Sequence, residues 1–366
     1  MNEASFIPKT PYEDSYWPSH GSIGFQAPSN IALVKYWGKH GLQLPMNASL
    51  SFTLGRCHTQ TVLSFSKKEK GAVDFDVFLN GTKTPSFAPK IQVFFERIEP
   101  YVPFLKSFRF VIETHNSFPH SSGIASSASG MGALAMCLVA MEQRLQGSTT
   151  TKLSIEALQK ASFLARLGSG SAARSIEGPL VVWGKHAAIE KSSDLYGTVY
   201  PYEVHPNFEN YQDAILLVDT GVKQVSSTVG HGLMQGHPYA DQRFRQANDH
   251  LGKLVPILRS GDLESFVAIV ESEALSLHAM MLTSQPYFVL MQPNTLEIIN
   301  RIWVYRRETG VQVCFTLDAG ANVHVLYPEN EKESVQKFIA SELEPFCKEG
   351  KYILDHAGLG AQRLLP

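Results

Sequence analysis

Cysteine is scarce in this sequence, and the four cysteines that it contains lie far apart. Cys57, Cys137, Cys314 and Cys347 form no C-x-x-C pair. Wide spacing of this kind argues against a disulfide framework and against a zinc site. We therefore interpret each cysteine as a small buried apolar residue, and we predict a reducing, cytoplasmic location.

Net charge and long apolar runs are also lacking. The formal net charge is −2 over 366 residues, so we do not expect a nucleic-acid-binding protein, and any basic site must be local. The longest strongly apolar stretch, residues 133–141, is far too short to cross a bilayer. The first 20 residues lack the basic start and apolar run of a signal peptide. We expect neither a membrane partner nor secretion.

The sequence does contain enough apolar residues for a large interior, since 44% of its residues are hydrophobic and 18% are charged. A single hydrophobic core stops growing before this length, which favours two domains. We predict an irregular arm at residues 1–20, a first domain at 21–205 and a second domain at 206–366. A polar, proline-containing stretch at residues 186–209 marks the boundary.

The spacing of apolar residues predicts a mixed order of strands and helices. The predicted strands are residues 22–27, 51–65, 73–79, 108–113, 215–218, 311–317 and 323–327. The predicted helices are residues 91–98, 131–145, 154–164, 239–258, 263–281 and 294–309. Asn80-Gly81 directly follows one predicted strand, and this dipeptide is typical of a tight hairpin.

Four polar side chains share one short strand-like segment, NIALVKYWGK. Lys35 and Lys39 supply ammonium groups that can meet phosphate oxygens. Asn30 and Tyr36 supply an amide and a phenol that can fix orientation through hydrogen bonds. This mixture suits a polyanionic ligand. The alternative is an exposed strand edge whose lysines only keep it soluble.

A serine-rich loop, residues 114–130, joins a predicted strand to a predicted helix. Its small residues let the backbone approach a ligand, and the free amides at a helix start favour an anion such as phosphate. The sequence contains no G-x-x-x-x-G-K-[ST], so a P-loop fold is not predicted. Ser126 and Ser127 place hydroxyls where a metal-bound triphosphate would lie. The alternative is a helix start whose small residues permit tight packing.

A second turn rich in glycine and serine precedes an arginine. Gly168 and Gly170 are expected to adopt unusual backbone angles, which would free amides and the hydroxyls of Ser169 and Ser171 for an oxyanion. Arg174 supplies a planar fork for a carboxylate or a phosphate. The alternative for Arg174 is a surface ion pair, as for most arginines.

Two loops of the second half carry further polar groups. Residues 219–228 bring a lysine and several hydroxyls together, and the alternative there is a loop followed by a Ser/Thr helix cap. Asp318 lies at a strand end beside small residues, where it is a candidate general base or hydroxyl-orienting group. The alternative for Asp318 is an Asx turn.

Together these segments resemble the GHMP kinase superfamily and, within it, the diphosphomevalonate decarboxylases. The similarity runs from about residue 24 to residue 325 and includes NIALVKYWGK, FPHSSGIASSASG, ARLGSGSAARS, VSST and FTLDAGAN in the expected order. The resemblance implies an α+β fold with a ribosomal-protein-S5-like N-terminal half and a ferredoxin-like C-terminal half. The active site would lie in the cleft between the halves, and the last segment would return to the first domain.

The resemblance also implies roles for individual residues. Asp318 would take or orient the proton of the substrate 3-hydroxyl, and Lys35 would lie near the transferred phosphoryl group. Arg174 would pair with the substrate carboxylate, and Asn30 would orient that arginine. The implied diphosphate-binding residues are Tyr36, Lys39, Ser169, Gly170, Ser171 and Ser227. The implied ATP-binding residues are Ser121, Ser122, Gly123, Ala125, Ser126 and Ser127, with Ser127 also a Mg²⁺ ligand.

The implied reaction is the ATP-dependent decarboxylation of 5-diphosphomevalonate to isopentenyl diphosphate, with Mg²⁺ as a cofactor and a homodimer as the assembly. Three alternatives stay open: a phosphomevalonate decarboxylase, a small-molecule kinase without decarboxylation, and a non-catalytic nucleotide-binding relative. The segment at residues 40–45 is shorter than the acidic stretch that is usual in the family. The sequence therefore leaves open whether the substrate carries one phosphate or two at its far end. Arg174 together with Asp318 favours a decarboxylase over a kinase, and the presence of Lys35 and Asp318 argues against a binding-only relative.

Overall fold

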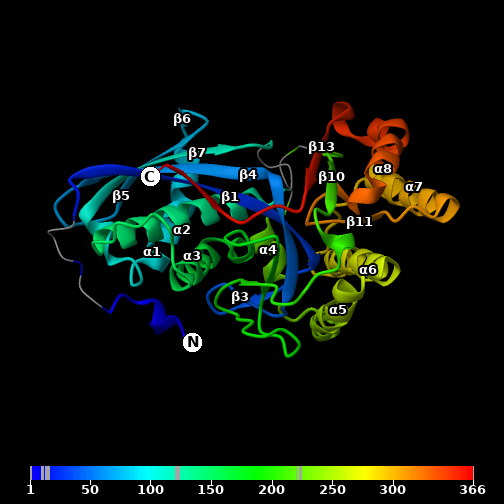
Figure 1. The fold of residues 1–366 in the computed structure, drawn as a ribbon, viewed down its shortest axis with the longest axis horizontal. Helices are drawn as coiled ribbons and strands as arrows, with labels where there is room; N and C mark the ends of the chain where they lie inside the picture. The colour runs from blue at the N-terminus through cyan, green and yellow to red at the C-terminus, as the bar shows by residue number, and fades with distance from the viewer. Residues whose placement is uncertain are drawn as a thin grey trace.

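The computed structural model of the chain describes residues 2–9, 12, 17–119, 124–219, 221 and 225–365. Two main β-sheets with flanking helices lie beside each other along the long axis of the molecule (Figure 1). One sheet is built mostly from the N-terminal half of the chain and the other from the C-terminal half. The mixed α+β composition agrees with the sequence prediction.

The N-terminal sheet contains eight strands among the described residues, and its main path runs in the order β14-β1-β4-β7-β5-β6. Its strands are β1 (His20–Val34), β4 (Ser49–Lys67), β5 (Asp74–Leu79), β6 (Thr82–Lys83), β7 (Phe108–Asn116), β8 (Leu180–Trp183), β9 (Thr198–Val199) and β14 (Gln362–Leu365). Strand β8 pairs with β4, and β9 pairs with β8. β5 and β7 run parallel, whereas β4 pairs antiparallel with both β1 and β7.

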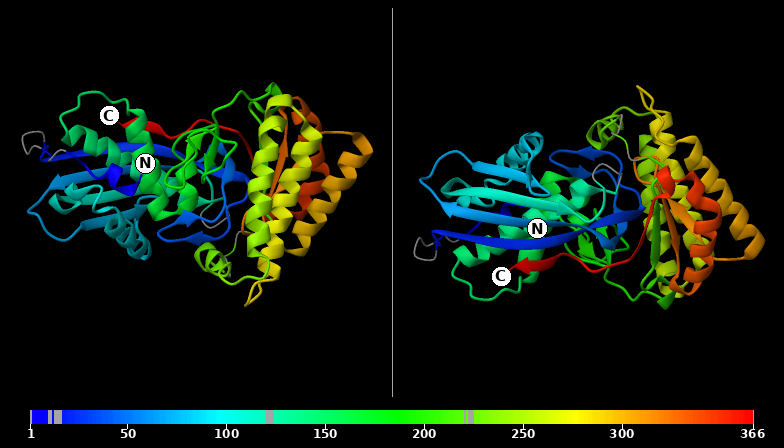
Figure 2. Two further views of the ribbon diagram at one scale, coloured as in Figure 1. Left: turned by 90° about the horizontal axis from the view of Figure 1, so that it is seen from below. Right: turned by 90° about the horizontal axis from the view of Figure 1, so that it is seen from above.

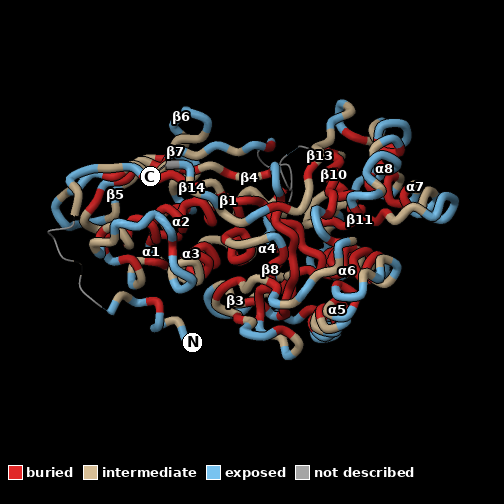
Figure 3. Tube along the Cα trace, in the orientation of Figure 1, coloured by how far each residue is buried: buried red, intermediate tan, exposed pale blue. Residues whose placement is uncertain are grey.

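Strand β4 illustrates how this sheet acquires one buried face. Over its second half, buried Thr59, Thr61, Leu63 and Phe65 alternate with more exposed side chains. A period of two is the pattern of a strand with one face on the core. Helices α1 (Ala88–Ile98), α2 (Ser126–Leu145) and α3 (Ile155–Gly168) cover that face. Figure 3 shows the buried residues gathered where these helices meet the sheet.

The predicted hairpin at Asn80-Gly81 is confirmed. β5 and β6 pair antiparallel across this two-residue loop. Asn80 has φ 52° and Gly81 has φ 77°, the left-handed angles that a type I′ turn requires and that Asn and Gly adopt at low cost.

The C-terminal sheet is antiparallel and runs in the order β11-β12-β10-β13. Its strands are β10 (Gln212–Leu216), β11 (Cys314–Thr316), β12 (Val323–Tyr327) and β13 (Tyr352–His356). Helices α7 (Pro293–Thr309) and α8 (Lys332–Phe338) pack on one face. Helices α5 (Ala240–Ser260) and α6 (Leu263–Leu282) pack on the other, where they adjoin the N-terminal half (Figure 2).

The two halves are joined by a shared core. Phe52 of β4 and Phe266 of α6 belong to one apolar cluster, which also includes residues of β10 and β12. Beside it, the Asp355 carboxylate of β13 accepts hydrogen bonds from the backbone amides of Arg56 and Cys57, at 2.8 and 2.7 Å. The chain then crosses back, and β14 pairs with β1. These contacts fix the position of one sheet against the other.

Helix α6 is long and apolar enough to cross a membrane by length and composition alone, the one such helix found in the described part of the chain. In the fold it packs against α5, β11 and β1, and 61% of its apolar window is buried. Core helices of folded domains meet the same criterion, and the packing of α6 is that of a core helix.

Most predicted elements are confirmed, with shifted ends. β12 has the predicted bounds, whereas β11 is shorter than the predicted strand at 311–317. Helix α2 begins at Ser126 rather than at residue 131, because the small residues of the serine-rich motif are themselves helical. The sequence did not predict a short hairpin or strand β13, and helix α4 corresponds only to the alternative of a Ser/Thr helix cap for residues 219–228. The hairpin consists of β2 (Lys39–His40) and β3 (Leu44–Pro45), and α4 is Ser227–Gly232.

Candidate active site

A cavity of about 430 Å³ lies between the two halves and is lined by residues from both. It brings together most of the residues that the sequence predicts for binding and catalysis. From those predictions, the lining contains Lys35, Tyr36, Lys39, Ala125, Ser126, Ser127, Ser169, Gly170, Ser171, Arg174, Ser227 and Asp318. Asn30 lies behind Arg174 instead of on the cavity wall. Ser121, Ser122 and Gly123 lie outside the described residues.

Lys35 and Asp318 meet across the cavity from opposite halves of the chain. The Lys35 Nζ atom lies 3.1 Å from Oδ1 of Asp318. The Lys35 side chain is 2% exposed and that of Asp318 is 28% exposed, so the carboxylate is the partner that faces the cavity. Burial lowers the pKa of Lys35, and the neighbouring Asp318 charge partly opposes that shift. The exposed-edge alternative is therefore wrong for Lys35.

The backbone of Lys35 is also held from both sides. Its amide donates to Oε2 of Glu273 at 2.8 Å, and its carbonyl accepts from Nδ2 of Asn47 at 2.9 Å. Glu273, on α6, is fully buried and also accepts from Arg243 and from Nδ1 of His250. Burial alone would raise the pKa of Glu273, but these hydrogen bonds outweigh it and the net pKa is lowered. A fixed anion from α6 thus positions the end of β1.

Arg174 is 3% exposed and lies on the cavity wall, so the surface ion-pair alternative is wrong. Its Nη1 donates to Oγ of Ser49, and its Nε donates to Oδ1 of Asn30 at 3.3 Å. Burial lowers the pKa of Arg174 to about 10, while the Asp318 charge acts in the opposite direction. The guanidinium is therefore still a cation at neutral pH, and it is oriented by partners behind it.

The glycine-rich turn lies close to the phenol of Tyr36. A Cβ atom on Gly170 would lie 2.8 Å from Oη of Tyr36, so glycine is required there for space. Neither Gly168 nor Gly170 has a positive φ. The expectation of unusual backbone angles is therefore wrong, and close packing is the reason for both glycines: a Cβ on Gly168 would lie 2.6 Å from Sδ of Met131.

Hydroxyls from three segments line the same part of the cavity. Oγ of Ser127, at the start of α2, lies 3.2 Å from Oγ of Ser169. Ser227 begins α4, and the preceding Ser226 caps that helix by accepting from the amide of Val229. The helix-cap alternative is thus confirmed for Ser226, while Ser227 lines the cavity. Oxygen groups of this kind can donate to phosphate oxygens.

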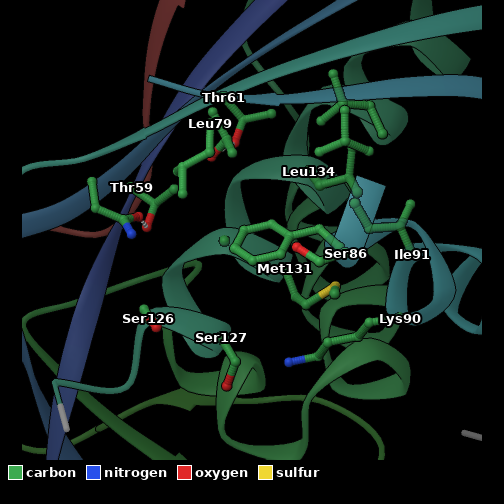
Figure 4. Close-up of a pocket in the computed structure, with 16 residues that line it drawn as sticks. Thr59, Thr61, Leu79, Ser86, Lys90, Ile91, Ser126, Ser127, Met131 and Leu134 are labelled. Carbon is green, nitrogen blue, oxygen red and sulfur yellow. Dashed lines mark hydrogen bonds between the residues drawn. The ribbon is translucent and has the colours of Figure 1, made fainter. Parts of the chain in front are cut away.

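A second cavity of about 250 Å³ adjoins the first between the N-terminal sheet and helices α1 and α2 (Figure 4). Ser126, Ser127 and Lys90 line both cavities, and Figure 4 shows the Lys90 ammonium group pointing toward Ser127. The remaining wall is largely apolar and includes Ile91 and Leu134. An apolar recess that opens onto hydroxyls and an ammonium group suits a nucleoside with its phosphates at the mouth.

Three residues of this region were not predicted from the sequence: Lys90, His231 and Glu273. Each lies outside the five motifs, on α1, α4 and α6 respectively. A possible signal existed only for Glu273, because an acid in an apolar helical pattern indicates a buried charge that needs a partner. Lys90 and His231 reach the cavity only through packing of the helices that carry them.

The oxygen donors of the cavity fit magnesium that is delivered by a nucleotide. Within the described residues, no group of three His, Cys, Asp or Glu side chains could hold a metal ion. The cavity does offer hard oxygen donors in the Asp318 carboxylate and the Ser127 hydroxyl. Mg²⁺ prefers oxygen ligands and commonly keeps waters and substrate phosphates in its coordination shell.

Comparisons with known proteins find relatives that cover most of the chain. Residues 27–194 match the diphosphomevalonate decarboxylase-like N-terminal domain, and residues 214–358 match the mevalonate 5-diphosphate decarboxylase C-terminal domain. The diphosphomevalonate decarboxylase of Debaryomyces hansenii is 30% identical over 330 residues, covering 84% of this chain and 79% of that protein. The relative from Aspergillus fumigatus is 29% identical over 335 residues, covering 87% and 80%.

Solved structures show the same fold. The mevalonate diphosphate decarboxylase of Staphylococcus aureus superposes with a TM-score of 0.80 at 26% identity, covering 94% of this chain and 98% of that one. The enzyme from Enterococcus faecalis superposes with a TM-score of 0.78 at 27% identity, covering 94% of this chain and 99% of that one. A structure of MDDEF in complex with MVAPP, AMPPCP and magnesium gives 0.79 at 27% identity, with the same coverage.

The two sheets with a cleft between them define a GHMP kinase fold, as the sequence predicts. Within the proteins of this fold, the family models and the relatives identify one family. The chain belongs to the diphosphomevalonate decarboxylase family.

Proposed function

We propose that this protein catalyses the ATP-dependent decarboxylation of 5-diphosphomevalonate to isopentenyl diphosphate, with ADP, phosphate and CO₂ as the other products. The observation that carries the proposal is the convergence of Arg174, Lys35 and Asp318 on one cavity. A fixed guanidinium suits the substrate carboxylate, and the neighbouring carboxylate suits the 3-hydroxyl. The fold family and the relatives support the same reaction.

In the first step, the substrate 3-hydroxyl takes the γ-phosphoryl group of ATP. Asp318 orients that hydroxyl and receives its proton, while Lys35, 3.1 Å from Asp318, supplies positive charge beside the transferred group. An alkoxide of a tertiary alcohol is costly, so placement of the hydroxyl against the phosphoryl group contributes more than base strength. The Ser127 hydroxyl would help to hold a Mg²⁺ ion that arrives on ATP, and such an ion would supply neutralisation of phosphate charge.

In the second step, the phosphorylated C3 loses phosphate while the C1–C2 bond breaks. The electron pair of that bond forms the C2=C3 double bond, and CO₂ leaves. Arg174 holds the C1 carboxylate in one orientation through a fork that Ser49 and Asn30 keep in place. Since CO₂ is neutral, its attraction to the guanidinium is weaker than that of the carboxylate, which favours departure.

The substrate's phosphorylated end would meet Tyr36, Lys39, Ser227 and the turn at residues 169–171. ATP would place its phosphates against Ser126, Ser127, Lys90 and the amide of Ala125, with its nucleoside in the adjoining apolar cavity. Lys90 extends the predicted set, because its ammonium group lies at the junction of the two cavities.

The test is to incubate the purified protein with ATP, Mg²⁺ and, separately, monophosphorylated and diphosphorylated mevalonate, measuring ADP and CO₂. We expect equal amounts of ADP and CO₂ with the diphosphorylated substrate. ADP without CO₂ would favour the kinase alternative, and turnover confined to the monophosphorylated substrate would favour a phosphomevalonate decarboxylase. The absence of both products would contradict the proposal.

We further infer a domain division near residue 205. In support, β1 and β4 to β9 belong to one sheet, which helices α1 to α3 accompany, and β10 to β13 form the other; only β14, at the end of the described chain, returns to the first sheet. A homodimer and a cytoplasmic location stay predictions of the sequence analysis. Sedimentation of the purified protein tests the first, and fractionation of cells tests the second.

A further inference from the structure

His231 lies on the cavity wall beside the predicted phosphate-binding residues, although no motif of the sequence includes it. The residue is 8% exposed and lines the cavity from helix α4. Its ring packs against Tyr36 and Trp37, with centroid distances of 4.3 and 4.5 Å. The side chain is therefore held in one position by aromatic contacts.

The backbone fixes which nitrogen of this ring carries a proton. The amide of Gly38 donates to Nδ1 of His231 at 2.9 Å. Because an amide only donates, Nδ1 must be the accepting nitrogen, and in the neutral ring Nε2 then carries the hydrogen. Gly38 has φ 98°, and a Cβ there would lie 2.8 Å from the ring of Phe244, so only glycine can present its amide in this way.

The surroundings keep the ring neutral. Burial, together with the positive charges of Lys39 and Arg174, lowers the pKa of His231 to about 3. Protonation of Nδ1 would also replace the Gly38 hydrogen bond by two facing N–H groups.

The Nε2–H group has no hydrogen-bond partner within the described part of the chain. His231 lines the cavity, so this group can donate to a ligand that is bound there. Lys39, Tyr36 and Ser227 line the same cavity and supply an ammonium group and hydroxyls, so an oxyanion is the acceptor that fits.

We propose that His231 is a substrate-binding residue whose Nε2–H donates to an oxygen of the substrate's phosphorylated end. The proposal rests on the function proposed above, and it deepens that function by adding a neutral donor to the phosphate site. A neutral ring orients the phosphate without adding to the repulsion between Lys39 and Arg174. Its hydrogen bond to Gly38 also ties phosphate recognition to the segment that carries Lys35 and Lys39.

Three substitutions separate binding from packing. His231→Asn keeps an oxygen near the Nδ1 position for the Gly38 amide but does not reach the ligand. His231→Gln places an amide nitrogen near the Nε2 position. His231→Phe keeps the ring and loses both polar groups. We expect His231→Asn and His231→Phe to raise KM for the diphosphorylated substrate about tenfold, which corresponds to about 1.4 kcal/mol, with KM for ATP unchanged. His231→Gln should restore most of the affinity.

A purely structural role gives a different pattern. In that case the three variants would lower Tm and raise KM for ATP and for the substrate alike, with no rescue by His231→Gln, and the proposal would be overturned. An unchanged KM for the substrate in His231→Asn would overturn it equally, even if the wild-type protein releases CO₂ as proposed.

A readout independent of turnover uses nitrogen NMR of the histidine rings with inorganic pyrophosphate as the probe. We expect the His231 signals to report a neutral ring protonated at Nε2, and pyrophosphate to shift the Nε2–H signal. Weaker pyrophosphate binding in His231→Asn would support the proposal even if no CO₂ were formed, in which case only the decarboxylase function would fail. A ring protonated at Nδ1, or unshifted signals at saturating pyrophosphate, would contradict the proposal.

Discussion

The two ends of the cavity differ in how far their side chains are already positioned by the fold. At the reacting end, Lys35 pairs with Asp318, and Arg174 is held by Ser49 and Asn30. At the phosphate end, the His231 ring is held by Tyr36, Trp37 and the Gly38 amide, but its Nε2–H group and the hydroxyls of Ser171 and Ser227 make no hydrogen bond within the described residues. Preorganised charge stabilises a transition state, whereas uncommitted donors mainly bind the ground state. Substitutions at the reacting end should therefore change kcat, and substitutions at the phosphate end should change KM.

The reacting end also depends on the registry of the two halves, since Asp318 comes from the C-terminal half and Lys35 from the N-terminal half. Glu273 on α6, in the C-terminal half, accepts a hydrogen bond from the amide of Lys35. The buried contacts of Glu273 with Arg243 and His250 hold its carboxylate in place for this hydrogen bond. The corresponding contact at the phosphate end is neutral, the hydrogen bond from the Gly38 amide to Nδ1 of His231, and most groups of that end belong to loops and helix starts.

The largest effect is expected for Asp318→Asn. The amide keeps the shape of the carboxylate but neither receives a proton nor pairs with the Lys35 charge, so kcat should fall about 10²–10⁴-fold. The substrate Kd should change little. Steady-state kinetics and calorimetry measure the two quantities. The matched control is Asp249→Asn, the same chemical change at an exposed position of α5. Wild-type kcat in Asp318→Asn would remove Asp318 from the mechanism.

A smaller loss is expected for Arg174→Lys. Lysine keeps the charge but loses the planar fork, and a hydrogen bond to a charged group is worth about 1.5–3 kcal/mol. We expect kcat/KM to fall about 10- to 100-fold and the ratio of CO₂ to ADP to fall below one. Arg259→Lys, at an exposed position of α5, is the control. An unchanged ratio with normal kinetics would reopen the kinase alternative.

At the phosphate end, Lys39→Met should raise KM for the phosphorylated substrate about tenfold, or about 1.4 kcal/mol, and leave kcat nearly unchanged. Methionine retains the chain length without the charge, so the dependence of KM on salt should also weaken. Lys337→Met, on the exposed face of α8, serves as the control. If Lys39→Met lowered only kcat, the phosphate end would contribute to the chemical step, and the division between a binding end and a reacting end would be wrong.

The smallest effect concerns pH. Burial lowers the pKa of Lys35 below the ordinary value of 10.5. A lysine with a lowered pKa loses its proton at a lower pH, so kcat/KM should begin to fall on the alkaline side below pH 10.5. Lys35→Arg, if its Tm matches the wild type, should move this limb to higher pH, because a guanidinium keeps its proton. If the alkaline fall of kcat/KM occurred at the same pH in Lys35→Arg, the group that titrates would be a residue other than Lys35.

The sequence predicted those parts of the fold and site that depend on contiguous segments. The hairpin at Asn80-Gly81, the core helices and the motif residues from Lys35 to Asp318 all follow from local patterns. His231 and Lys90 could not be predicted, because they reach the cavity only through the packing of α4 and α1. The glycine turn was located correctly but for the wrong reason, since close packing against Tyr36 is a tertiary effect.

The most direct test is a crystal structure of the Asp318→Asn variant with 5-diphosphomevalonate and a non-hydrolysable ATP analogue. We predict that the substrate carboxylate lies within hydrogen-bond distance, about 3 Å, of the Arg174 guanidinium, and that the 3-hydroxyl lies equally close to residue 318. A substrate bound with its carboxylate away from Arg174, or with its 3-hydroxyl facing away from residue 318, would contradict this prediction.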